Sequence, residues 1–274
     1  MELIQPFQYE FFLHGVIVAI LVGAINGILG IYIILRGMSY IGHALSHSIF
    51  GGVMVSYLIN LNLYIGATIW GIASSIIMNE ISKRNNIKLD AIINIISSAG
   101  FAIGVFLLSI RKSFIINFEA LLFGNILGIR DVDLFMIIII SIISFIFFFF
   151  FNKAMLFTIF DKESAKIYGI RTDIVEFIFS IIIAIVVIAS IYVIGVTLLA
   201  AAITAPAVSA RLLTKSLSKM IFFSIIIGVS TSFVGMYVSF IFNSSSGATI
   251  VLLDVLIFAL ILLSSFLYKT YNKY

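Results

Sequence analysis

The sequence predicts an all-α bundle of transmembrane helices, on the basis of its composition and of the spacing of its apolar runs. Of its 274 residues, 62% are hydrophobic and 10% are charged, which leaves too little polar surface to cover a soluble globule of this size. The apolar residues form runs of roughly 20, the length with which an α-helix crosses about 30 Å of hydrocarbon. These runs recur along the whole chain. We therefore expect a polytopic membrane protein embedded in a lipid bilayer.

Hydropathy predicts roughly nine membrane-spanning helices, within a range of roughly eight to ten. The stretch from Ser113 to Gly128 is apolar but interrupted by polar residues and glycine, and we expect a re-entrant or interfacial segment there. No soluble domain separates the helices, so residues 1–274 are predicted to form a single transmembrane domain. The predicted helices cover residues 11–35, 38–60, 63–82, 90–110, 133–152, 174–194, 196–213, 219–242 and 248–268.

The distribution of lysine and arginine predicts an N-terminus outside the cell and a C-terminus in the cytoplasm, because cytoplasmic loops retain most of these residues. With this orientation all but three of the 16 lysines and arginines lie on the cytoplasmic side. The three exceptions, Arg111, Lys112 and Arg130, flank the expected re-entrant segment. The net charge of +4 then reflects helix ends that meet anionic lipid headgroups, and it requires no nucleic-acid partner.

Two of the three histidines, His43 and His47, lie four residues apart in the second predicted helix. This spacing places both imidazoles on one helix face. Ionisable groups inside a membrane often mark ion pathways, and neutral imidazole binds zinc and other first-row metals. The alternative is that each ring hydrogen-bonds a neighbouring helix as a structural contact. The sequence has no cysteine, so thiolate ligands are excluded.

A metal ion bound by these histidines needs further ligands, because two nitrogens are too few for a tetrahedral or octahedral site. A symmetric dimer with this helix at its axis would supply four nitrogens. The pair therefore favours a homodimer with a pore between the two copies. A transport site must also release its ion, which makes an open set of ligands preferable to a closed cage.

Residues 38–47 contain the motif Met-Ser-Tyr-Ile-Gly-His-Ala-Leu-Ser-His. This motif resembles the second-helix signature of the zinc/manganese/iron (ABC-3 type) permease family of metal ABC importers, where Gly-Asp-Ala-Leu-Ser-His is typical. Further matches follow in the family's order at residues 121–128, 195–199, 205–213 and 246–251. By this resemblance the family's metal-coordinating Asp and His map to His43 and His47. The imidazole of His43 in place of a carboxylate is expected to shift preference from Mn²⁺ towards zinc.

The resemblance implies the membrane-spanning permease subunit of an ATP-binding-cassette importer of the vitamin B12/metal-chelate type, in a bacterial cytoplasmic (inner) membrane. The expected cargo is a divalent transition-metal ion, with zinc slightly preferred and manganese and iron kept open, and no permanently bound cofactor is expected. The expected partners are a second copy of the chain, cytoplasmic ATP-binding subunits and an extracytoplasmic metal-binding protein. The alternative is a secondary active cation transporter without an ATPase subunit, which should show an inverted repeat with broken helices.

The chain lacks the Gly-x-x-x-x-Gly-Lys-Ser/Thr pattern that cradles nucleotide phosphates, so it is not expected to be an enzyme, and ATP hydrolysis is assigned to a separate subunit. A coupling segment is expected at about residues 153–173. Within it, Asp161 is predicted as a helix N-cap and Gly169 as a C-terminal stop. The short helix between them resembles the family's coupling helix, although a capped surface turn has the same pattern. The expected coupling residues are Asp161, Glu163, Ala165, Lys166, Tyr168 and Gly169.

Two further residues are candidates for the ion pathway. Pro206 interrupts the seventh predicted helix, where it removes a hydrogen bond and could provide a gating hinge, although proline is also tolerated in membrane helices for packing reasons. Asp254 is a carboxylate inside the last predicted helix, and it could line the pathway or pair with a polar neighbour. Gly23, Gly27 and Gly30 are expected to permit close helix packing rather than to form a site.

Overall fold

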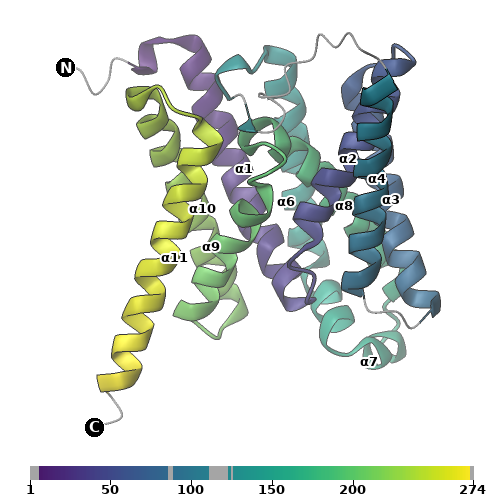
Figure 1. Cartoon of the computed structure of the whole chain (residues 1–274). Helices are drawn as coiled ribbons and strands as arrows, with labels where there is room; N and C mark the ends of the chain where they lie inside the picture. Colours follow the sequence, from purple (N-terminus) through teal and green to yellow (C-terminus); the bar gives the residue numbers. More distant parts are fainter. Residues whose placement is uncertain (1–5, 86–88, 111–122, 125, 272–274) are drawn as a thin grey trace. The chain divides into compact units, whose positions relative to one another are not determined.

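The computed structural model describes residues 6–85, 89–110, 123–124 and 126–271, and within these ranges the regular structure is entirely helical (Figure 1). Nine of the helices in the described part have 15 residues or more, and they correspond one to one with the nine predicted segments. The helices are α1 (Glu10–Leu35), α2 (Ile41–Leu58), α3 (Leu63–Asn85), α4 (Leu89–Ile110), η2 (Ile126–Gly128), α6 (Asp131–Phe160), α7 (Lys162–Ile167), α8 (Thr172–Ile194), α9 (Leu199–Leu213), α10 (Leu217–Phe242) and α11 (Ser246–Tyr271).

Two helix boundaries differ from the prediction for local reasons. The second helix begins at Ile41 rather than near residue 38, because α1 ends in a left-handed residue, Gly37 (φ 70°). The Gly37 N–H donates to the Ile34 carbonyl and the Met38 N–H to the Ile33 carbonyl, the pattern of a Schellman cap. At the other boundary, α6 continues to Phe160 instead of ending near residue 152, because neither glycine nor proline interrupts residues 152–160.

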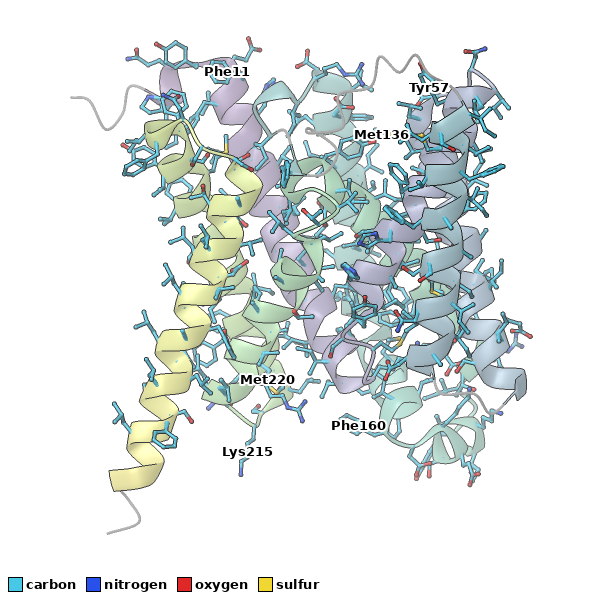
Figure 2. The ribbon with its side chains drawn as sticks, in the orientation of Figure 1. Phe11, Tyr57, Met136, Phe160, Lys215 and Met220 are labelled. Atoms are coloured by element: carbon cyan, nitrogen blue, oxygen red, sulfur yellow. The ribbon has the colours of Figure 1, made fainter. Side chains whose placement is uncertain are left out.

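In the described part of the chain, six helices are long and apolar enough to cross a membrane, namely α1, α4, α6, α8, α10 and α11. The apolar α9 has 15 residues, so it is about 22 Å long and would cross about 30 Å of hydrocarbon only together with the residues that flank it. Large apolar side chains such as Phe11, Met136 and Phe160 are exposed along the helices, as a lipid-facing surface requires (Figure 2). Of the expected re-entrant segment, residues 113–122 and 125 lie outside the described residues, and residues 126–128 form the single 3₁₀ turn η2.

The helices group into two compact units, each with its own packing. The first unit comprises Met1–Ser39, Glu119–Ser141 and Ser190–Tyr274, and in it α1 packs on α9 and α10 while α11 packs on the same two helices. Small residues allow the backbones to approach closely. A Cβ atom added at Gly23 would overlap the carbonyl oxygen of Gly228, and one at Gly30 would overlap the carbonyl oxygen of Ile203. These contacts confirm the packing role expected for these glycines.

The second unit comprises Tyr40–Phe118 and Ile142–Ala189, and its central feature is α2, which packs on both α3 and α4. The α2 backbone meets α4 where Gly51 faces Gly100, so closely that a Cβ atom at Gly51 would overlap the carbonyl oxygen of Gly100. On the α3 side, the Ser48 and Ser74 hydroxyls share a hydrogen bond of 2.7 Å. Because α3 and α4 hold α2 on two sides, the remaining face of α2 has a fixed orientation within this unit.

Candidate functional site

The two predicted metal-binding histidines lie together on α2. The ring centroids of His43 and His47 are 4.2 Å apart, with an angle of 63° between the ring planes. This is edge-to-face contact, so the imidazoles share one face of the helix as their i, i+4 spacing predicts.

Burial distinguishes these two residues from the others in the first fourteen residues of α2. Between Ile41 and Met54, every residue is buried except His43 and His47, which are both half-buried. A polar ring inside an apolar helix is costly unless it reaches a polar partner or water. The accessible face of this stretch is therefore formed by the two imidazoles. In a single copy of the chain these rings are exposed enough to contact a ligand or a second copy.

Aromatic rings extend this face at both ends, a feature that the sequence reading missed. The Tyr40 ring lies 4.9 Å from the His43 ring, and the Phe101 ring of α4 lies 5.0 Å from the His47 ring. Tyr40 precedes His43 by three residues, so helical spacing alone could have placed it on this face. Phe101 comes from another helix, and no local pattern indicates it. These neighbours restrict how far the imidazoles can rotate.

Among the residues that the structure describes, no group of three or more His, Cys, Asp or Glu side chains could hold a metal ion. Within one copy, the described residues therefore add no third His, Cys, Asp or Glu ligand to the histidine pair. The two other pathway candidates, Asp254 and Pro206, belong to the other unit of the chain.

Asp254 is buried in α11, with 2% of its surface exposed. The Thr231 hydroxyl of α10, which donates to the Ile227 and Gly228 carbonyl oxygens of its own helix, is a polar neighbour of this carboxyl group, and the oxygen Oδ1 lacks a hydrogen-bond partner in the described part of the chain. Asp254 thus has a polar neighbour, as the interpretation of a structural pairing required. Pro206 is also buried, and α9 continues through it from Leu199 to Leu213.

The predicted cap and stop of the short loop helix are both confirmed in α7. The Ser164 backbone N–H donates to the Asp161 carboxylate at 2.9 Å, and the Ser164 hydroxyl donates to its second oxygen. These bonds, with that of the hydroxyl foremost, hold the pKa of the Asp161 carboxyl below its usual value, so the cap is ionised at neutral pH. At the other end Gly169 adopts φ 79°, and the Ile170 N–H donates to the Ala165 carbonyl.

The surface of α7 combines exposed apolar and charged side chains. Ile167 and Tyr168 are 84% and 76% exposed, and Glu163 and Lys166 are exposed between them and the cap. Ala165, one of the expected coupling residues, is fully buried and so is not on the exposed surface of α7. A six-residue helix has little stability of its own, so exposed apolar residues on it are suited to a partner surface.

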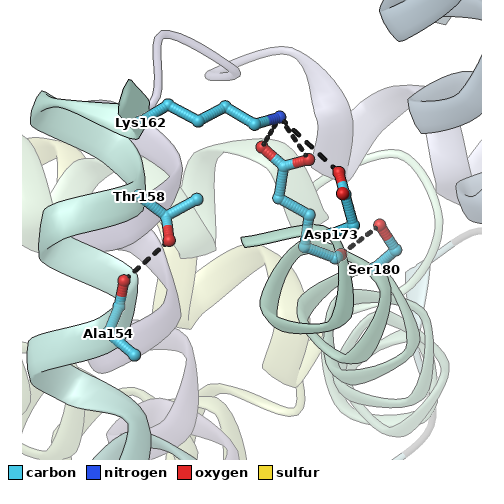
Figure 3. Close-up of polar contacts among 6 residues, drawn as sticks. Ala154, Thr158, Lys162, Asp173 and Ser180 are labelled. Atoms are coloured by element: carbon cyan, nitrogen blue, oxygen red, sulfur yellow. Dashed lines mark hydrogen bonds and ion pairs between the residues drawn. The ribbon is translucent and has the colours of Figure 1, made fainter. Parts of the chain in front are cut away.

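An ion pair between α7 and α8 was not predicted from the sequence. Lys162 donates to both carboxylate oxygens of Glu176 at 3.0 Å, and the Glu176 side chain is 8% exposed (Figure 3). The sequence feature that could have indicated this ion pair is Glu176, a glutamate near the start of the apolar helix α8. A buried carboxylate at such a position needs a cation nearby. The partner, 14 residues earlier, could not be read from that signal.

The helical fold, with several helices long and apolar enough to cross a membrane, defines a multi-pass membrane protein. The sequence pattern described as the ABC 3 transport family matches residues 8–265. The chain therefore belongs to the ABC 3 transport family, and it is a multi-pass protein of the bacterial cytoplasmic membrane.

Individual relatives cover nearly the whole chain. The manganese transport system membrane protein MntC of Listeria monocytogenes serovar 1/2a is 37% identical over 251 residues, which are 92% of this chain and 89% of the relative. A probable iron transport system membrane protein of Haemophilus influenzae is 33% identical over 263 residues, 96% of this chain and 93% of the relative. A chain of the solved structure of PsaBC from Streptococcus pneumoniae in complex with Fab superimposes with a TM-score of 0.83 at 33% identity, covering 95% of this chain and 94% of that one.

Proposed function

We propose that this chain is the membrane-spanning permease subunit of an ATP-driven importer, and that its cargo is a divalent transition-metal ion. The observation that carries the proposal is the pair of half-buried imidazoles on an otherwise buried stretch of α2, His43 and His47. Family membership supplies the transport class, and relatives named for manganese and iron transport support a metal cargo. A plain packing role for the rings would not require them to form the accessible face of the helix.

The ion is proposed to pass between two copies of the chain. Each copy offers two imidazoles, which is half of a tetrahedral set, and a twofold axis beside α2 would bring four nitrogens to one ion. Such a site would form and open as the copies move, which suits a cargo that must be released. The fold is proposed to be that of the vitamin B12/metal-chelate type of importer, with residues 1–274 acting as one permease domain.

The proposed topology has roughly nine membrane passages, with the N-terminus outside and the C-terminus in the cytoplasm. This orientation places α7 in the cytoplasm together with most of the lysines and arginines. The predicted cytoplasmic set is Arg36, Lys83, Arg84, Lys88, Lys153, Lys162, Lys166, Arg171, Arg211, Lys215, Lys219, Lys269 and Lys273.

The exposed side of α7 is proposed to dock on a cytoplasmic ATP-binding subunit. Ile167 and Tyr168 would enter an apolar cleft, and Glu163 and Lys166 would contact its polar rim. Asp161 and Gly169 would act indirectly, by fixing the two ends of the helix.

On the outer side, an extracytoplasmic metal-binding protein is the proposed donor of the ion. Asp254 and Pro206 remain proposed pathway residues, the first as a carboxylate with one unsatisfied oxygen and the second as a hinge.

Two observations bear on which metal is carried. The names of the relatives favour manganese or iron, whereas two imidazoles per copy favour zinc, because Mn²⁺ prefers oxygen ligands. We propose that the site accepts all three ions and that His43 raises its relative affinity for zinc.

Replacing His43 by Asp is expected to restore an oxygen ligand and to raise the preference for Mn²⁺ over Zn²⁺ by about tenfold. The measurement is uptake of labelled Mn²⁺ at increasing concentrations of competing Zn²⁺. His14→Asp, the same change at the third histidine in the other unit, is the matched control and should leave the ratio unchanged. An unaltered ratio in His43→Asp would remove His43 from the determinants of selectivity.

The transport class itself is tested by purifying the tagged chain from its native membrane. We expect it to co-purify with an ATP-hydrolysing subunit, and the reconstituted complex should accumulate Mn²⁺ or Zn²⁺ only when ATP is supplied. Uptake that proceeds without ATP and collapses on addition of a proton ionophore would favour the secondary active transporter instead.

A further inference from the structure

The ion pair between Lys162 and Glu176 joins the loop helix α7 to the long helix α8. Lys162 is the first residue of α7, and Glu176 lies one turn inside α8. The ammonium group binds both carboxylate oxygens at 3.0 Å and lies 4.0 Å from Asp173, so it is surrounded by the acidic first turns of α8 (Figure 3). This is a fixed contact, because the Glu176 carboxylate is nearly buried and has lost most of its alternative interactions with water.

Near its C-terminal end the same short helix lies beside α6. The ring centroids of Tyr168 and of Phe157, in the last turn of α6, are 6.1 Å apart, while Tyr168 stays 76% exposed. Ala165, between Lys162 and Tyr168, is fully buried. A displacement of α7 would reach α8 through the hydrogen-bonded contact between Lys162 and Glu176.

Stability alone does not account for the choice of a charged anchor to α8. Taking the Glu176 carboxylate out of water costs free energy that a well-packed apolar pair would not require, while the Lys162 side chain keeps 36% of its surface exposed. A lysine at the first position of a helix is also unfavourable next to the positive end of the helix. What the ion pair provides is a directional, two-bonded link between two elements, which resists separation and sliding in a way that apolar contact does not.

We propose that Lys162 and Glu176 are positioning residues that transmit movement of α7 to α8, so that the ATPase cycle is converted into movement of a membrane helix. The inference rests on the proposed function, because it requires α7 to be the surface on which the ATP-binding subunit acts. It assigns to α8 the role of the first membrane helix to respond.

The test uses the complex purified from native membranes and reconstituted in vesicles, with metal uptake and ATP hydrolysis measured together. The variant Lys162→Met/Glu176→Gln removes both charges at similar side-chain length, so that no lone buried carboxylate is left to destabilise the fold. We expect it to assemble and to hydrolyse ATP, but to move at least about fivefold less Mn²⁺ per ATP than the wild type. The charge exchange Lys162→Glu/Glu176→Lys should recover at least about half of the lost coupling.

Lys215→Met is the matched control, because it removes an exposed lysine between α9 and α10 in the other unit. It should keep the wild-type ratio of metal transported to ATP hydrolysed. An unchanged ratio of metal to ATP in the neutral double variant would overturn the proposal, as would uncoupling that the charge exchange fails to repair in assembled complexes. If the wild-type chain co-purifies with no ATP-hydrolysing subunit, the proposed function fails first and this inference falls with it. That result is distinguishable, because it appears before any variant is made.

Discussion

Replacing His47 by Ala is expected to reduce metal uptake by at least about a hundredfold, because it removes two of the four proposed nitrogen ligands from a dimer at once. The α2 backbone should be unaffected. His47 is half-buried and its ring contacts those of His43 and Phe101, whereas the packing of α2 on its neighbours involves other residues such as Ser48 and Gly51. The measurement is accumulation of labelled Mn²⁺ and Zn²⁺ by cells that lack other importers for these ions.

The matched control for this prediction is His14→Ala, which makes the same change at the remaining histidine, in α1 of the other unit. Membrane abundance and co-purification of the ATP-binding subunit should equal the wild type in both variants. Wild-type uptake in His47→Ala would show that the α2 face is not the ion site. Equal losses in both variants would show that the loss is not specific to that face.

The second large effect is expected at Gly23, where replacement by Val should prevent the first unit from packing. The added Cβ atom would overlap the carbonyl oxygen of Gly228 and the hydroxyl oxygen of Ser232 on α10. The overlap with Gly228 is with backbone and not with the end of a flexible side chain, so α1 and α10 would have to separate. Overpacking of this kind costs about 1–3 kcal/mol or more, a large part of the stability of a typical domain.

This effect is measured as the amount of detergent-extracted protein that elutes as a single species, together with its unfolding temperature. Ile17→Phe is the control, because it adds bulk at an exposed position of the same helix and should be tolerated. A Gly23→Val protein with the wild-type unfolding temperature would mean that α1 and α10 do not pack as closely as the structure shows.

Much of the fold was predictable because the information is local. The length of each apolar run determines a helix, and all nine predicted segments are helices. The same holds for α7, since a cap at Asp161 and a left-handed stop at Gly169 involve only residues within one or two turns. The shared face of His43 and His47 follows from helical periodicity in the same way.

The remaining features depend on which helices meet, and hydropathy carries no information about that. Phe101 beside His47, Thr231 beside Asp254 and Lys162 beside Glu176 each pair residues from different helices. Small residues indicated only that close packing occurs, and the partners of Gly23 and Gly30 had to be seen in three dimensions. The burial of Ala165, an expected coupling residue, was missed for the same reason, because the sequence pattern of a short helix does not show which side packs against the rest of the chain.

The most direct test of the proposed metal site is X-ray absorption spectroscopy on the purified complex loaded with Zn²⁺. If the imidazoles of two copies hold the ion, the spectrum should show about four imidazole nitrogens at roughly 2.0–2.1 Å, and His47→Ala should lose half of them. A shell of oxygen atoms alone, or an imidazole signal that persists unchanged in His47→Ala, would contradict the proposed site.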